Sequence, residues 1–125
     1  MLMVITSKKL NADVAQNRRF ATLVSLMLSS QTKDETTDAA ISKLRAAVGG
    51  SISVDGIITA EESTISEAID KVGFWRRKTG YLKKAAQKLR EDFNSDVPKT
   101  VDELCSLPGV GPKMAFLTLQ IAWNL

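Results

Sequence analysis

Apolar residues recur along this chain with the spacing of α-helices. The first helix is expected over residues 18–30, where one face is apolar: Phe20, Leu23, Val24, Met27 and Leu28. A second apolar stripe, from Tyr81 to Phe93, predicts a longer helix. The last segment, Met114 to Leu125, is apolar on almost every side, so we expect it at the centre of the core.

Polar residues and glycines predict where other helices begin and end. Three T-x-x-E pairs are typical of capping boxes, and they place helix starts at Thr32, Thr64 and Thr100. Gly49-Gly50 and Gly73 are expected stops, a short helix is expected over 53–60, and Pro112 suits the first position of the last helix. No segment has a convincing strand pattern. The prediction is an all-α domain of six or more short helices.

The composition narrows the possible chemistry. The chain has 125 residues, 44% of them hydrophobic, which is enough for one globular domain with a core. Its single cysteine, Cys105, excludes an internal disulfide and a four-cysteine metal site, and the lack of histidine removes the commonest general base and metal ligand. No run is long and apolar enough for a membrane span, and we expect no signal peptide, no membrane partner and a monomer.

Charge is distributed unevenly. The net charge is only +3, but Asp55 to Asp70 contains five acidic and no basic residues, whereas Lys71 to Arg90 contains eight basic and no acidic residues. A local basic face of this kind indicates a polyanion as partner. The candidate phosphate contacts are Arg76, Arg77, Lys78, Lys83, Lys84 and Lys88. The aromatics in VGFWRRK, Phe74 and Trp75, could stack on bases, but we interpret them as core residues.

The segment LPGVGPK, Leu107 to Lys113, combines a glycine turn with a lysine at the start of a helix. Outward-pointing amides of such a turn could bind a phosphate, and the residues concerned are Leu107, Pro108, Gly109, Val110 and Gly111. The turn could equally be an ordinary connection between packed helices. The positive end of the helix dipole disfavours an ammonium at Lys113, and a neutral amine can form a Schiff base. The alternative is a solvated lysine.

Gln31 in SLMLSSQTKD needs an explanation of its own. Capping explains the neighbouring Thr32, but glutamine is a weak cap. A polar side chain at the tip of a loop between two helices could instead point at a ligand such as a base.

Three segments, SLMLSSQTKD, VGFWRRK and LPGVGPKMA, together resemble the endonuclease III family of DNA glycosylases, particularly its eukaryotic branch, over Phe20 to Leu125. The resemblance implies a helix–hairpin–helix glycosylase fold, with residues 1–17 as an N-terminal extension, 18–125 as a partial domain and the hairpin at 107–111. It also implies base excision repair of oxidised pyrimidines in duplex DNA, with base flipping, cleavage of the glycosidic bond and β-elimination at the abasic site, in the nucleus or the mitochondrion.

The same resemblance assigns roles to particular residues. Lys113 corresponds to the Schiff-base nucleophile, which favours a bifunctional lyase over the related adenine glycosylases. The hairpin 107–111 corresponds to the phosphate-gripping element, and Gln31 to the residue that fills the gap left by the flipped base.

The resemblance also implies parts that this sequence lacks. The family's catalytic aspartate lies in a V-D-T-H segment after the lysine, but here twelve residues follow Lys113 and Glu103 is the last carboxylate. The expectation is a C-terminally truncated chain, either an isoform or a partial gene model, with weak or lost activity. The family's 4Fe-4S cluster is expected only in a full-length form. Two other hypotheses are a non-catalytic DNA-binding fragment and a fragment that does not fold.

Overall fold

The computed structural model describes the backbone of residues 2–125 and the side chains of residues 12–125. Seven helices and no strand occur in this part of the chain, as the sequence predicts. The helices are α1 (Leu2–Ser29), α2 (Asp34–Ala47), α3 (Val54–Thr59), α4 (Glu62–Ala68), α5 (Trp75–Asp92), α6 (Val101–Cys105) and α7 (Pro112–Ala122). No helix within the described residues is long and apolar enough to cross a membrane.

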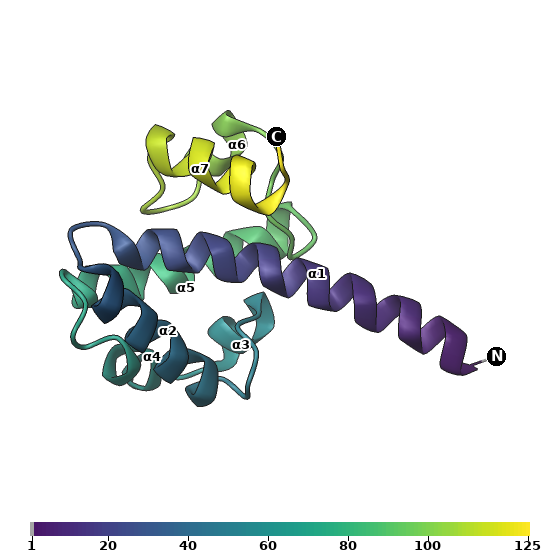
Figure 1. Cartoon of the computed structure of the whole chain (residues 1–125), viewed down its shortest axis with the longest axis horizontal. Helices are drawn as coiled ribbons and strands as arrows, with labels where there is room; N and C mark the ends of the chain where they lie inside the picture. The colour runs from purple at the N-terminus through teal and green to yellow at the C-terminus, as the bar shows by residue number, and fades with distance from the viewer. Residues whose placement is uncertain (1) are drawn as a thin grey trace.

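α1 organises the arrangement, because it packs against α2, α5 and α7. In Figure 1 it runs between two groups of helices, with α2, α3 and α4 on one side and α6 and α7 on the other, and α5 passes behind it. Its predicted apolar face is confirmed, since Phe20, Leu23, Val24, Met27 and Leu28 are all buried. The helix nevertheless begins at Leu2 rather than at Arg18, and its first turns project beyond the other helices (Figure 1). The domain boundary predicted between residues 17 and 18 therefore falls inside α1.

The three predicted capping boxes have different outcomes. Thr100 does cap α6, because its side chain accepts a hydrogen bond from the Glu103 amide at 3.2 Å. The prediction for Thr64 is wrong, since α4 already begins at Glu62. The prediction for Thr32 is also wrong: α2 begins after Lys33 without a side-chain cap, and the Thr32 hydroxyl bonds elsewhere.

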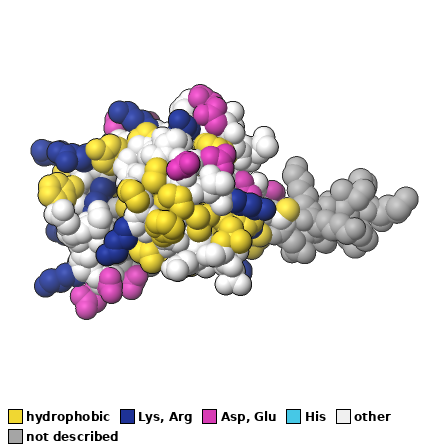
Figure 2. All heavy atoms as spheres, turned by 90° about the horizontal axis from the view of Figure 1, so that it is seen from above, with side chains coloured by type: hydrophobic (Ala, Val, Ile, Leu, Met, Phe, Trp, Pro, Cys, Tyr) yellow, Lys and Arg dark blue, Asp and Glu magenta, His cyan; other side chains and the backbone are white. Residues whose placement is uncertain are grey.

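The last helix is not surrounded by protein, contrary to the sequence prediction. α7 buries one face, formed by Ala115, Thr118 and Leu119, while Phe116 and Ile121 are 59% and 61% exposed. Figure 2, which views the molecule from the side of α7, shows hydrophobic side chains in the middle of that surface. The amino-acid pattern identified an apolar helix but could not show which side meets α1.

Trp123 fixes the end of α7 to the rest of the fold. Its indole N–H donates to the Val97 carbonyl at 3.1 Å, and two cations lie over its ring, with Arg19 Cζ at 4.0 Å and Lys99 Nζ at 4.4 Å from the centroid. Arg19 also forms two hydrogen bonds of 2.9 Å with Asp96. Cation–π contacts of this geometry are stabilising. They join α7, α1 and the loop before α6.

Gly80 offers a test of α5. An added Cβ there would meet no atom within 4 Å, although glycine is a poor residue inside a helix. We expect Gly80→Ala to raise the free energy of unfolding by about 0.5–1 kcal/mol, measured as a higher urea midpoint with an unchanged m-value. As a contrast, Gly56→Ala should lower the midpoint, because its Cβ would lie 2.9 Å from the Ser53 Oγ that caps α3. A lower midpoint for Gly80→Ala would contradict the placement of Gly80 inside α5 with open space beside its Cα.

Candidate nucleic-acid interface and lysine cleft

The hairpin between α6 and α7 is a tight turn packed on α5. Gly109 has a φ of +83°, and a Cβ on it would lie 2.8 Å from ring carbons of Tyr81. Among the described residues, the exposed amides of Gly109 and Gly111 have no hydrogen-bond acceptor. The hairpin thus offers the amides of two exposed residues beside a helix N-terminus, which suits an anion. Sequence reasoning placed Tyr81 in an apolar stripe but missed that it supports the turn.

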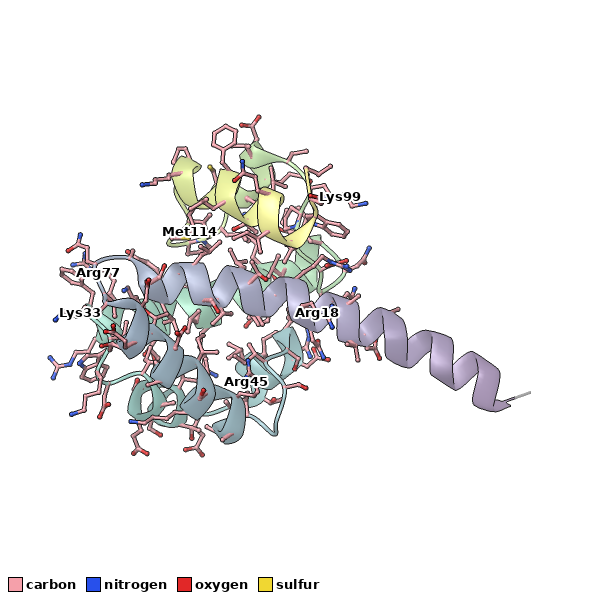
Figure 3. All side chains as sticks on the ribbon, in the orientation of Figure 1. Arg18, Lys33, Arg45, Arg77, Lys99 and Met114 are labelled. Carbon is pink, nitrogen blue, oxygen red and sulfur yellow. The ribbon has the colours of Figure 1, made fainter. Side chains whose placement is uncertain are left out.

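Lys113 lies in the first turn of α7, two residues after the N-cap Gly111, and its side chain is exposed. It borders a cleft of about 440 Å³ between α1 and α7. The other lining residues are Leu26, Ser29, Ser30, Gly111, Pro112, Met114 and Leu117. Figure 3 shows Met114 reaching from α7 toward α1 at this place. Lys113 is the one amine among the described residues lining the cleft, and no carboxylate lines it.

A second pocket, of about 210 Å³, lies on the other side of Ser30, which lines both. It brings together the loop after α1, the start of α5 and the hairpin. Its lining residues are Met27, Ser30, Gln31, Phe74, Arg77, Lys78, Tyr81 and Gly109. Three segments that the sequence singled out separately therefore meet at one end of the molecule, where Figure 3 places Arg77 and Lys33.

Gln31 and Phe74 face solvent at this pocket. Gln31 lies in the loop between α1 and α2, as predicted, and is exposed. Phe74 was interpreted as a core residue, but it is 56% exposed, with the Arg77 guanidinium 5.8 Å from its ring centroid. The interpretation failed because Phe74 precedes α5 in a left-handed conformation, φ 57°, that turns it away from the core. Trp75, by contrast, packs against the core as expected.

The six basic candidates do not form one face. Arg76, Arg77 and Lys84 are exposed and Lys88 is half-buried. Arg77, Lys84 and Lys88 are spaced seven and four residues apart, so they share one side of α5. Figure 2 shows basic side chains gathered at the end of the molecule away from the N-terminus.

Two of the candidates are corrected by the structure. Lys78 is only 6% exposed, and its Nζ donates to the Leu28 and Ser30 carbonyls. Burial lowers the pKa of Lys78 below its ordinary value of 10.5. Lys83 donates to the Ile58 and Ala60 carbonyls at the end of α3. Both ammonium groups are occupied within the protein, so neither is placed to contact phosphate.

The sequence and the fold both match known proteins. A family model described as HhH-GPD superfamily base excision DNA repair protein matches residues 24–119. This chain belongs to that superfamily. The predicted helix–hairpin–helix fold and the resemblance to the eukaryotic endonuclease III branch are therefore confirmed.

The relatives of this HhH-GPD chain are longer than the chain. It is 48% identical to the chicken (Gallus gallus) endonuclease III-like protein 1 over 109 residues, which cover 87% of this chain and 38% of that protein. It is also 48% identical to the fission yeast (Schizosaccharomyces pombe) endonuclease III homolog over 106 residues, which cover 85% of this chain and 30% of that protein. The chain thus spans about a third of the length of these relatives.

Two solved structures have the same fold as this HhH-GPD chain. One is a non-covalent endonuclease III–DNA complex, with a TM-score of 0.78 and 26% identity over 85% of this chain and 48% of that one. The other, with the same values, is a trapped endonuclease III–DNA covalent intermediate described as an estranged-adenine complex. A 4Fe-4S cluster, which the resemblance implies, needs several thiolates, and the lone Cys105 of this chain does not fit it.

Proposed function

We propose that this chain carries the hairpin and nucleophile of an endonuclease III-type DNA glycosylase with AP lyase activity. The proposed substrate is duplex DNA with an oxidised pyrimidine or an abasic site, and Lys113 forms the Schiff base. The observation that carries this proposal is the exposed Lys113 at the cleft between α1 and α7, directly after the hairpin. The similar endonuclease III, trapped as a covalent intermediate with DNA, supports it.

The proposed chemistry uses the free amine of Lys113. Its Nζ attacks C1′ of the open-chain sugar at an abasic site, a C–N bond forms, and the C1′ oxygen leaves as water, which gives a Schiff base. Water then removes a C2′ proton, a C2′=C3′ double bond forms, and the C3′–O bond breaks, which releases the 3′ part of the strand with its 5′-phosphate. Hydrolysis of the C=N bond returns the amine.

The proposed interface with DNA uses the Lys113 cleft and the Gln31 pocket, both of which Ser30 lines. The amides of the exposed residues Gly109 and Gly111 would donate hydrogen bonds to a phosphate of the DNA, which would hold the DNA backbone beside Lys113. Gln31 would fill the gap left by a flipped base, and the exposed Phe74 ring would wedge between neighbouring bases.

The test is covalent trapping. The protein is incubated with a duplex that contains one abasic site, and borohydride is added to reduce the C=N bond to a stable amine. A protein–DNA adduct that carries the peptide containing Lys113 is expected. If a folded, DNA-binding protein gives no adduct, the lyase proposal fails.

A second candidate function is DNA binding without chemistry. It is favoured by the lining of the Lys113 cleft, which contains no carboxylate among the described residues to move protons. The trapping test separates the two functions, since a pure binding module would retain affinity for the duplex and form no adduct.

Arg77 tests where the duplex lies. It borders the same pocket as Gln31 and the hairpin, and its side chain is exposed. We expect Arg77→Ala to weaken binding to any duplex and to reduce the slope of log K against log salt by about 1. Arg45→Ala, at the end of α2 and far from Arg77 in Figure 3, is the matched control and should change neither value. Equal effects of the two substitutions would place the duplex elsewhere.

A further inference from the structure

Lys78 is a buried lysine of α5 whose ammonium group lies at the C-terminal end of α1. Its Nζ lies 2.9 Å from the Leu28 carbonyl, 2.5 Å from the Ser30 carbonyl and 3.4 Å from Thr32 Oγ1. These acceptors match the three donors of an ammonium. The carbonyls belong to the C-terminal end of α1, where the helix dipole favours a positive charge.

Thr32 extends these bonds to a third segment. Its Oγ1 accepts from the Gly73 amide at 3.0 Å as well as from Lys78. The two backbones are close here, because a Cβ on Gly73 would lie 2.8 Å from the Gln31 carbonyl oxygen. The end of α1, the loop after it and the turn before α5 are therefore joined through one ammonium and one hydroxyl.

Two of the exposed residues at the pocket, Gln31 and Phe74, are next to this network in the sequence. Gln31 lies between Ser30 and Thr32, and Phe74 directly follows Gly73. Both have left-handed backbones, with φ values of 54° and 57°, which residues other than glycine rarely adopt. Such conformations persist only where the surrounding structure imposes them.

We propose that Lys78 is a positioning residue that fixes the loop carrying Gln31 relative to the turn carrying Phe74. The proposal deepens the proposed function and rests on it for the part that concerns DNA. A duplex would meet a preformed pair of side chains, so recognition of a lesion would not have to order two separate segments. Lys78, which the sequence analysis predicted to contact phosphate, instead holds the two surface segments in place from inside the protein.

The first arm of the test uses the free protein. Lys78→Met removes the donors but keeps the length of the side chain, and Lys43→Met, on the exposed side of α2, is the matched control. We expect the Gly73 amide to exchange its hydrogen about tenfold faster or more in Lys78→Met, and at the wild-type rate in Lys43→Met. Unchanged exchange at Gly73 in Lys78→Met would overturn the proposal.

The second arm measures preference for a lesion. The readout is the ratio of Kd for an undamaged duplex to Kd for the same duplex with one tetrahydrofuran abasic-site analogue. We expect Lys78→Met to reduce this ratio by about tenfold, because small displacements of positioned groups have large effects. A purely structural role would lower the melting temperature but leave the ratio unchanged, since a smaller folded fraction raises both Kd values equally.

Thr32→Val provides a second variant in case Lys78→Met does not fold. It removes the hydroxyl that links Lys78 to Gly73 and leaves both carbonyl bonds of Lys78 in place. Faster exchange at Gly73 and a reduced ratio support the proposal, and wild-type behaviour in both overturns it. If the wild type itself shows no preference for the lesion, the proposed function fails, and the exchange measurements alone then decide whether Lys78 holds the two segments.

Discussion

Lys113→Gln loses the borohydride-trapped adduct with an abasic duplex, by about a hundredfold or more, the scale on which one placed catalytic group contributes. The physical reason is that an amide nitrogen cannot attack the sugar aldehyde. Lys113 is the one amine among the described residues lining the cleft between α1 and α7, so no neighbouring lysine is placed to replace it. The measurement is the adduct band on a denaturing gel over time.

The control for this experiment is Lys43→Gln, an equivalent change on the exposed side of α2. It should form the adduct at the wild-type rate. Lys113→Gln should retain its thermal melt, because the Lys113 side chain is exposed. It should also bind the duplex, since the hairpin amides are unchanged. Adduct formation by Lys113→Gln at the wild-type rate would show that another amine reacts.

The helices and most of the core could be predicted because they depend on periodicity. The face of α1 from Phe20 to Leu28 is buried as its spacing predicts, and Thr100 caps α6 within three residues of sequence. Such features are local, so the sequence contains both partners. The resemblance then supplied the fold and the hairpin, because each of its three motifs is a short contiguous segment of the sequence.

Several of the errors concern partners that are distant in the sequence. Thr32 has the pattern of a cap, but its hydroxyl accepts from the Gly73 amide, 41 residues away. The sequence does not distinguish Lys78 and Lys83 from the exposed Lys84. A lysine can pack its aliphatic stem on apolar surface whether its ammonium group ends in water or on a carbonyl of the protein. Which of them is buried depends on where the ends of α1 and α3 meet α5.

Phe74 shows a different limit. An aromatic next to Trp75 and after a buried Val72 is reasonably interpreted as core. The positive φ of Phe74 reverses that expectation, and a positive φ is rare enough in phenylalanine that no pattern predicts it. Sites at which sequence rules fail in this way are often functional, which agrees with its place beside Gln31.

Gly109→Ala should damage both stability and DNA binding. The substitution places a residue with a side chain at φ +83° and its Cβ 2.8 Å from the Tyr81 ring. We expect the free energy of unfolding to fall by about 1–3 kcal/mol. Affinity for duplex should fall as well, because the amides of the turn move. Gly111→Ala is the matched control for stability: its φ is −100°, no atom lies within 4 Å of its Cβ, and its effect should stay within about 0.5 kcal/mol.

A double-mutant cycle separates the two causes of the Gly109 effect. Tyr81→Ala removes the ring that the new Cβ would strike but leaves the backbone at residue 109 in its left-handed conformation. Gly109→Ala should therefore destabilise the Tyr81→Ala protein less than the wild type, and the remaining cost measures the backbone strain together with the 3.0 Å contact to the Cβ of residue 81. Equal costs in the two backgrounds would mean that contact with the ring contributes nothing. In that case the hairpin would be held on α5 by something other than the Tyr81 ring against Gly109, and the glycine would serve only the turn.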